Sequence, residues 1–225
     1  MKDVDLSMDI TPKVAIRLSG TGGQGLLLAG RILAEAAAIY DGLNVVQSNS
    51  YGPEARGGAS RSEVVMSRGE VDDLRCKDFD ILICLSQKAC DSYYADLIER
   101  GTLIVDSTNV NVVPTSRAIE VPMTKMAVED CGDRMATNVI ALGVLCGVSE
   151  VVTLKALESA LAVLLRKDLV DRNKKALRLG YEAGRQIVEG THDRKRFGMR
   201  DFSFVREAAP TGKDNRKNGR HKVAA

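Results

Sequence analysis

The sequence predicts an α/β fold of three layers, in which helices cover both faces of a mostly parallel, Rossmann-like sheet. Three observations indicate this class. Short apolar segments alternate with helical ones over the first 121 residues, a glycine-rich loop joins the first strand to the first helix, and the rest of the domain reads as helical. These last helices are expected to form a C-terminal cover. At 225 residues, 44% of them hydrophobic, the chain suits one large domain.

The first half of the chain is expected to supply the sheet. Strands are predicted over residues 14–18, 44–47, 62–67, 80–85 and 103–105, with an edge strand over 117–121. Residues 80–85 (DILICL) are nearly all apolar, which is typical of a strand covered on both faces. Helices are predicted over 24–40, where Leu and Ala recur at helical spacing, and over 88–100, ended by Gly101.

The second half is expected to be helical, and it sets the domain boundaries. Helical periodicity covers residues 123–128, 135–148, 154–166 and 169–188. Thr153 is a predicted N-cap for the third of these helices, and Gly190 ends the last. We therefore expect an irregular segment over 1–12, the domain over 13–190, and a polar, basic, poorly ordered tail over 191–225.

Composition argues against several classes of function. The net charge is +2, aromatic residues make up 4% and Trp is absent, so we expect neither nucleic-acid nor membrane binding. The five cysteines form no C-x-x-C pair, which argues against a zinc ribbon or a ferredoxin-type cluster and favours reduced, mostly buried thiols. Both histidines, His192 and His221, lie in the tail, so the fold lacks the commonest general base. We predict a cytoplasmic protein with no catalytic or metal-binding residue of its own.

The junction after the first strand reads Ser-Gly-Thr-Gly-Gly-Gln-Gly over residues 19–25. Gly20, Gly22 and Gly25 fit G-x-G-x-x-G in the context that the motif requires, and Gly23 and Gln24 lie inside it. Glycines let backbone N–H groups and a helix N-terminus face a phosphate. No carboxylate ends the second strand, which disfavours a classical NAD site. A phosphate site is favoured, and a tight turn needed only for packing stays an alternative.

A second glycine-rich segment follows the second strand and reads SYGPEARGG over residues 50–58. Arg56, next to Gly57 and Gly58, could hold a phosphate or carboxylate through two hydrogen bonds. Doubly wound sheets bind ligands at this edge. An ion pair between Arg56 and Glu54, or with another subunit, is an equally favoured explanation.

Taken together, GTGGQG, SYGPEARGG and DILICLSQ resemble the gamma subunit, or gamma domain, of 2-oxoacid:ferredoxin oxidoreductases. The resemblance extends from about Val14 through Gly184 and looks most like the 2-oxoglutarate branch. It implies a heteromeric enzyme that makes acyl-CoA and carbon dioxide from a 2-oxoacid and reduces ferredoxin. It further implies alpha and thiamine-binding beta subunits and a cluster-bearing subunit or ferredoxin as partners. Thiamine diphosphate and iron–sulfur clusters are then expected on those partners.

On this resemblance, the glycine loop and the segment Arg56-Gly57-Gly58 would shape the coenzyme A path near the thiamine site. Tyr51 and Asn138 are secondary candidates for polar contacts, although a packed ring and a satisfied helical amide explain them equally well. Two other classes stay open. They are a stand-alone Rossmann-like module that binds a nucleotide and an NAD(P)-dependent oxidoreductase, and both would act without partner subunits.

Overall fold

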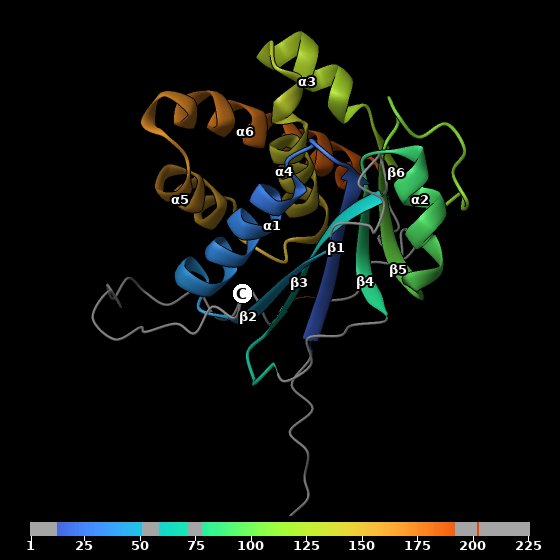
Figure 1. The fold of residues 1–225 in the computed structure, drawn as a ribbon, viewed down its shortest axis with the longest axis horizontal. Helices are drawn as coiled ribbons and strands as arrows, with labels where there is room; N and C mark the ends of the chain where they lie inside the picture. Colours follow the sequence, from blue (N-terminus) through green and yellow to red (C-terminus); the bar gives the residue numbers. More distant parts are fainter. Residues whose placement is uncertain (1–12, 51–58, 72–77, 192–201, 203–225) are drawn as a thin grey trace, which may run out of the picture.

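The computed structural model describes residues 13–50, 59–71, 78–191 and 202, and these form a six-stranded sheet with helices on both sides (Figure 1). This confirms the predicted fold class. The strands lie in the order β2-β3-β1-β4-β5-β6. Their bounds are β1 Lys13–Thr21, β2 Asn44–Ser50, β3 Ala59–Ser67, β4 Phe79–Cys84, β5 Leu97–Asp106 and β6 Ile119–Val121.

One strand departs from the parallel arrangement that the alternation of elements suggests. The pairs β1–β4, β4–β5 and β5–β6 are parallel, whereas β3 runs antiparallel to both β1 and β2. Only eight residues separate the end of β2 from the start of β3. A parallel crossover needs a dozen or more, so consecutive strands this close pair as a hairpin. β3 therefore pairs with β2 along one edge, and its other edge pairs with β1.

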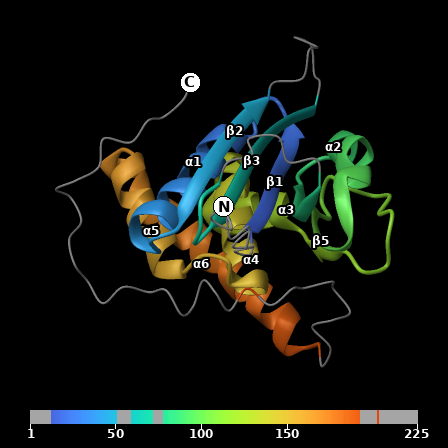
Figure 2. The same cartoon turned by 90° about the horizontal axis from the view of Figure 1, so that it is seen from below.

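The helices divide unequally between the two faces of the sheet (Figures 1 and 2). One face carries most of them, and their shared apolar cluster takes Val14, Ile16 and Leu18 from alternate positions of β1. The opposite face carries α2 and a smaller cluster that includes Leu82 and Cys84 of β4. The helices are α1 Leu26–Glu35, α2 Gln87–Tyr93, α3 Met123–Cys131, α4 Thr137–Ser149, α5 Leu154–Leu164 and α6 Lys167–Glu189.

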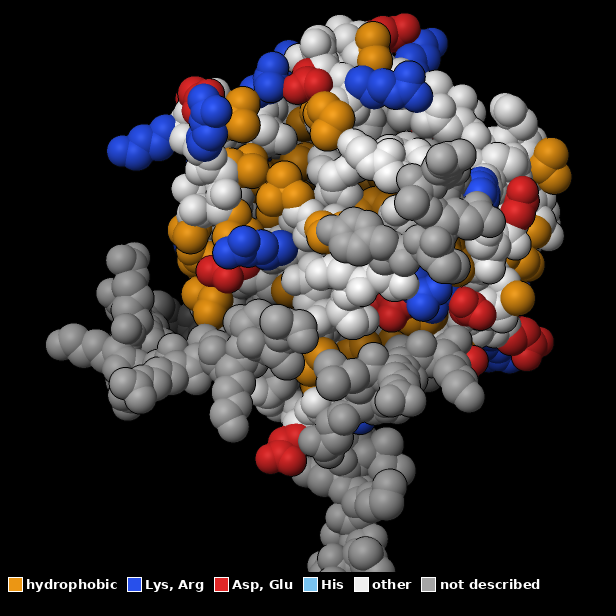
Figure 3. Space-filling model, viewed as in Figure 1, with side chains coloured by type: hydrophobic (Ala, Val, Ile, Leu, Met, Phe, Trp, Pro, Cys, Tyr) orange, Lys and Arg blue, Asp and Glu red, His pale blue; other side chains and the backbone are white. Residues whose placement is uncertain are grey.

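Helix α4 is the centre of the larger side, because all thirteen of its residues are buried. A helix that is apolar all round is covered all round, and α6 packs directly on it. Glycines bring the two backbones together. A Cβ built on Gly180 of α6 would lie 2.1 Å from the carbonyl oxygen of Ile140, and one built on Gly143 of α4 would lie 2.1 Å from that of Leu177. Figure 3 shows hydrophobic side chains at the surface on this side of the molecule.

The predicted helix over residues 88–100 is wrong in its second half. Helix α2 ends at Tyr93, a 3-10 turn covers Tyr94–Asp96, and Leu97 already belongs to β5. Leu97 pairs with Phe79 of β4 and packs against the smaller cluster, so burial in the sheet overrides local helical spacing. The predicted 24–40 helix begins at Leu26 and finishes in a π-helical turn over Ala36–Tyr40.

The remaining elements lie within a few residues of their predicted bounds. The Thr153 side chain accepts a hydrogen bond from the backbone N–H of Ala156 at 3.1 Å, which confirms it as the N-cap of α5. In the segment assigned to the tail, Phe202 is only 5% exposed and belongs to the main apolar cluster. The packed core therefore extends past residue 190 at this position. No helix in the described ranges is long and apolar enough to cross a membrane.

Candidate functional site

The glycine loop lies where β1 ends and α1 begins, at the edge of the sheet reached by the carboxyl ends of the parallel strands. Gly25 is the residue before α1 and has φ 71°, while Gly23 has φ 87°. Both values lie in the left-handed region that favours glycine. Gly25 offers no side chain to cap α1, so the first N–H groups of this helix receive no side-chain cap from it. This is the arrangement that the sequence predicts for an anion site.

The glycines of the motif fall into two groups, according to whether a Cβ at the position would meet neighbouring atoms. A Cβ on Gly20 would lie 2.2 Å from Oε1 of Gln24, and one on Gly25 would lie 2.3 Å from Nδ2 of Asn138. These two positions are glycine because neighbouring side chains fill the space. Nothing lies within 4 Å of a Cβ built on Gly22 or Gly23, and both residues are exposed. Gly22 and Gly23 therefore leave backbone open to a ligand.

Gln24 and Asn138, both predicted as ligand contacts, hold the loop in place. Oε1 of Gln24 accepts from the backbone N–H of Thr21 at 2.7 Å, and its Nε2 donates to the carbonyl of Leu85 at 3.1 Å. Nδ2 of Asn138, at the start of α4, donates to the carbonyl of Gly25 at 3.0 Å. One side chain thus ties the loop to the end of β4 and the other ties it to α4.

A buried polar network next to this loop was missed in the sequence. Asp106, at the end of β5, has 0% exposure. Its Oδ2 accepts from Nδ2 of Asn109 at 2.7 Å and from Oγ1 of Thr124 at 2.5 Å, and its Oδ1 accepts from the backbone N–H of Thr124 at 3.2 Å. Asn109 also donates to the carbonyl of Leu85 at 3.4 Å. An Asp directly after an apolar strand, with Asn and Thr close behind, is the signal that could have revealed it.

The network connects the two side chains that hold the loop, Gln24 and Asn138. The Leu85 carbonyl receives both Gln24 and Asn109. Thr124 in turn lies 3.4 Å from Oγ1 of Thr137, which directly precedes Asn138 in α4. Gln24 and Asn138, the two side chains that hold the glycine loop, are therefore linked to each other through residues at the ends of β4 and β5. Such a connected network holds a backbone segment in one geometry before any ligand arrives.

The other predicted contacts, Tyr51, Arg56, Gly57 and Gly58, lie outside the described residues. The residues that flank them are described. Ala59, at the start of β3, pairs with Thr21 of the glycine loop, and Tyr93 donates to the Ala59 carbonyl at 3.0 Å. Since β3 runs antiparallel to β1, β3 begins beside the glycine loop. The described residues on either side of the Arg-Gly-Gly segment, Ser50 and Ala59, thus lie at the same edge of the sheet as this loop.

The described cysteines are free thiols, and three of these four are buried. Burial raises the pKa of Cys146 to about 12. The hydrogen bond with Cys90, followed by burial, raises the pKa of Cys84 well above its usual range, and the same bond lowers the pKa of Cys90. Cys76 lies outside the described residues. Within the described ranges, no three His, Cys, Asp or Glu residues come together as a metal site.

With this geometry in hand, comparison with known proteins identifies the family. The profile described as pyruvate ferredoxin/flavodoxin oxidoreductase matches residues 15–183. The chain belongs to this family. The match begins in β1 and ends in α6, so it includes the glycine loop, the polar network and the flanks of the Arg-Gly-Gly segment.

Individual family members sharpen the match. The chain is 41% identical over 179 residues to the 2-oxoglutarate synthase subunit KorC of Methanocaldococcus jannaschii, covering 76% of this chain and 94% of that one. A solved keto/oxoacid ferredoxin oxidoreductase gamma subunit from Geobacter sulfurreducens is 44% identical, with a TM-score of 0.71 over 77% of this chain and 97% of the other. These findings confirm the predicted resemblance to gamma subunits.

A third solved protein shares the fold within a longer chain. It is the 2-oxoglutarate:ferredoxin oxidoreductase from Magnetococcus marinus, solved with 2-oxoglutarate, coenzyme A and succinyl-CoA bound. The TM-score is 0.69 at 20% identity, over 77% of this chain and 31% of that one. At this identity the likeness shows the fold alone. The same fold therefore occurs both as a separate chain and as part of a larger one.

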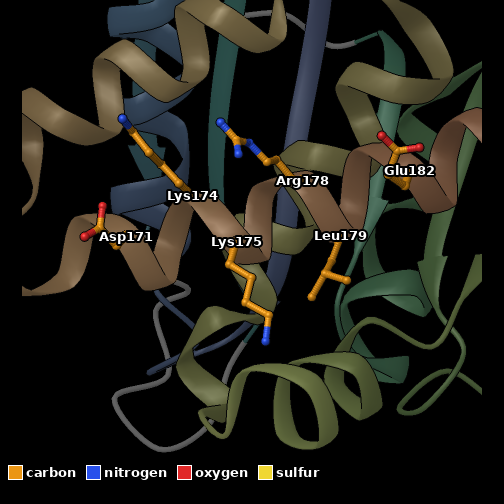
Figure 4. Close-up of a pocket in the computed structure, with 6 residues that line it drawn as sticks. All are labelled: Asp171, Lys174, Lys175, Arg178, Leu179 and Glu182. Atoms are coloured by element: carbon orange, nitrogen blue, oxygen red, sulfur yellow. The ribbon is translucent and has the colours of Figure 1, made fainter.

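In the present chain, a surface pocket of about 510 Å³ lies apart from the two glycine-rich motifs (Figure 4). All of its lining residues belong to α6: Asp171, Lys174, Lys175, Arg178, Leu179 and Glu182. Two of its cations already have partners. Arg178 pairs with Glu158 at 2.6 Å, and Lys175 donates to the Asp130 carbonyl at 2.8 Å. None of the six belongs to the glycine loop or a strand end, so this pocket is not the candidate site.

Proposed function

We propose that this chain is the gamma subunit of a 2-oxoglutarate:ferredoxin oxidoreductase and that its carboxyl edge forms part of the coenzyme A path. The observation that carries the proposal is the glycine loop. Gly22 and Gly23 present open backbone at the start of α1, while Gln24 and Asn138 fix the loop from both sides. The 41% identity to a 2-oxoglutarate synthase subunit supports the choice of oxoacid.

The overall reaction would convert a 2-oxoacid, coenzyme A and two oxidised ferredoxins into acyl-CoA, carbon dioxide, a proton and two reduced ferredoxins. When bound in the partner subunits, thiamine diphosphate and iron–sulfur clusters would supply the decarboxylation and the electron transfer. The part of this chain is to bind and orient coenzyme A. Backbone N–H groups of the loop and the Arg56 guanidinium would hold anionic groups of the coenzyme.

The NAD(P)-dependent alternative is less consistent with the sheet. A dinucleotide-binding fold places its second strand beside the first and ends that strand with an acidic residue. Here β3 lies between β1 and β2, and β2 contains no Asp or Glu from Asn44 to Ser50. The ribose hydroxyls of NAD would find no carboxylate at the usual place.

Gly22→Val tests the loop in the assembled complex. The position has room for a side chain and no positive φ, so we expect the complex to fold and assemble. The added isopropyl group would block the approach of a phosphate, which should raise the KM for coenzyme A with little change in the KM for the oxoacid. Gly25→Val is the matched contrast, because it collides with Asn138 and should disrupt folding itself. An unchanged KM for coenzyme A in the Gly22 variant would refute the proposed role of the loop.

Arg56→Ala tests the second motif. Loss of a charged hydrogen bond to coenzyme A should cost about 1.5–3 kcal/mol of binding, seen as a raised KM in an intact complex. Arg56→Lys should restore binding only in part, because an ammonium lacks the planar fork. If Arg56 only pairs with Glu54, both variants should behave like the parent. If it is an assembly residue, the subunits should separate during gel filtration.

A further inference from the structure

Arg61 is a cation at the same edge of the sheet that neither motif contains. It lies on β3, opposite Ser19 of β1 and Ser50 of β2, the first residues of the two glycine-rich segments. Arg61 is two residues from Ala59, where β3 pairs with the glycine loop. Its side chain is 33% exposed, so it borders both the packed interior and solvent.

The lower part of the Arg61 side chain is held in a buried ionic cluster. Arg17, with a side chain 4% exposed, pairs with Glu63 at 2.9 Å and with Asp96, and stacks on the ring of Phe79 at 3.9 Å. The guanidinium of Arg61 lies 5.3 Å from the ring of Tyr93, on which Arg17 also stacks. The cluster therefore restricts the position of Arg61 before any ligand binds.

The charge of Arg61 is only partly satisfied in this cluster. Its Nε lies 2.8 Å from Oε1 of Glu63, but the contact lacks the alignment of a hydrogen bond. The same oxygen already accepts from Nε of Arg17 at 3.0 Å and lies 2.9 Å from Nη2 of Arg17. The terminal nitrogens of Arg61 donate to no residue in the described part of the chain. Among the described residues, the four N–H donors on the terminal nitrogens of this positioned guanidinium thus have no hydrogen-bond acceptor.

We propose that Arg61 binds a phosphate group of coenzyme A. The proposal rests on the proposed function. The geometry favours an anion with several oxygens, because a planar guanidinium donates two parallel hydrogen bonds to phosphate. The ligand would extend from the open backbone of Gly22 and Gly23 across the edge of β1 to β3. A carboxylate of a partner subunit could in principle meet the same donors, and the experiment separates these two sources.

The test compares Arg61→Gln with the parent complex, using coenzyme A and pantetheine, which lacks every phosphate, as acceptors. We expect the KM for coenzyme A to rise at least about tenfold, the usual effect of losing a charged hydrogen bond, with kcat nearly unchanged. The KM for pantetheine should not move. Dephospho-coenzyme A then indicates which phosphate Arg61 contacts, since the effect of the variant persists only if the pyrophosphate is the partner.

Arg100→Gln is the matched control. It removes the same charge from an exposed residue near the amino end of β5, and should leave both KM values unchanged. Arg61→Lys should restore coenzyme A binding in part. An unaltered KM for coenzyme A in an intact Arg61→Gln complex would overturn the proposal. Separation of the subunits on gel filtration would also overturn it, because it would place a partner carboxylate at Arg61.

Calorimetry keeps this inference distinct from the proposed function. If the parent complex binds no coenzyme A at all, the proposed function fails. Titration with inorganic pyrophosphate then decides the role of Arg61. Binding by the parent and its loss in Arg61→Gln would retain an anion site, and equal behaviour of the two proteins would reject it.

Discussion

The two faces of the sheet are stabilised by different kinds of contact. On the larger side, α1, α4, α5 and α6 enclose an apolar cluster in which the backbones of α4 and α6 touch at glycines. On the smaller side, the centre of β1 and β3 carries Arg17 and Glu63, covered by aromatic rings and by α2. The first side depends on close packing and the second on matched charge.

This difference between the two faces indicates which of them can carry a ligand-binding side chain. Close packing is intolerant of added volume and offers no unpaired polar group. An ionic cluster at the margin of the core can hold an arginine in position and still leave some of its donors available. Arg61 is a partly exposed member of that cluster, and it pairs with Ser19 at the start of the glycine loop. The ionic side therefore contributes to the candidate site, while the apolar side supports it.

The largest effect is expected at the contact between α4 and α6. Gly180→Ala would bring a methyl group to 2.1 Å from the Ile140 carbonyl, and backbone cannot move aside as a flexible side chain can. We expect a loss of more than about 4 kcal/mol in the free energy of unfolding, beyond the usual range for overpacking. Urea denaturation of the variant measures it. Gly22→Ala, with open space around its Cβ, should lie within about 0.5 kcal/mol of the parent.

The next effect tests how far the apolar side extends along the chain. Phe202→Ala should cost about 3 kcal/mol, since a ring that is 5% exposed would leave a cavity in the main cluster. Deletion of residues 211–225 should change stability by less than about 0.5 kcal/mol, because that segment has little apolar area to bury. Thermal denaturation of both variants gives the comparison. Equal behaviour of the two would contradict the docking of Phe202.

On the ionic side, Arg17→Met should cost about 2–3 kcal/mol. The substitution removes the aligned Arg17 donor from Glu63, which has a side chain 13% exposed and keeps only the Ser48 hydroxyl as an aligned donor within the described residues. Asp96, at 41% exposed, can return to water. Adding Glu63→Gln should recover part of the loss, because the unmatched charge is then gone. A double variant less stable than the single one would show that the cluster does not act through charge. Chemical denaturation of the three proteins decides.

The smallest effect concerns a buried carboxylate on the apolar side. Asp41 is 4% exposed and accepts from the backbone N–H and the hydroxyl of Thr153, both at 2.8 Å. Burial raises the pKa of Asp41 above its ordinary 3.8, so the folded state favours its protonated form. The stability it contributes is complete below pH 3.8 and is lost as the pH rises through the folded pKa. The stability of the parent relative to Asp41→Asn should therefore fall over this range, and a flat difference would disprove the shift.

Local patterns were enough for the α/β class, the glycine loop and most element bounds. The apolar run at β4, the helical spacing of α5 and its Thr153 cap all depend on neighbours in sequence. The conformation of residues 97–100 does not depend on neighbours in sequence. Their spacing continued that of α2, but pairing with β4 decided their conformation. The antiparallel β3 likewise follows from a loop too short for a crossover.

By itself, the sequence determined which residues could bind an anion, because glycine content and side-chain chemistry are local properties. Only the tertiary structure decided how those residues divide their work. Gln24 and Asn138 hold the loop, whereas Gly22 and Gly23 leave its backbone open. Asp106 belongs to the hydrogen-bond network that links Gln24 and Asn138 through contacts between residues far apart in sequence. Arg61 was invisible beforehand for the same reason. Its available donors depend on how Arg17, Glu63 and Tyr93 meet around it, and pairing across a sheet is not written in the spacing of residues along a chain.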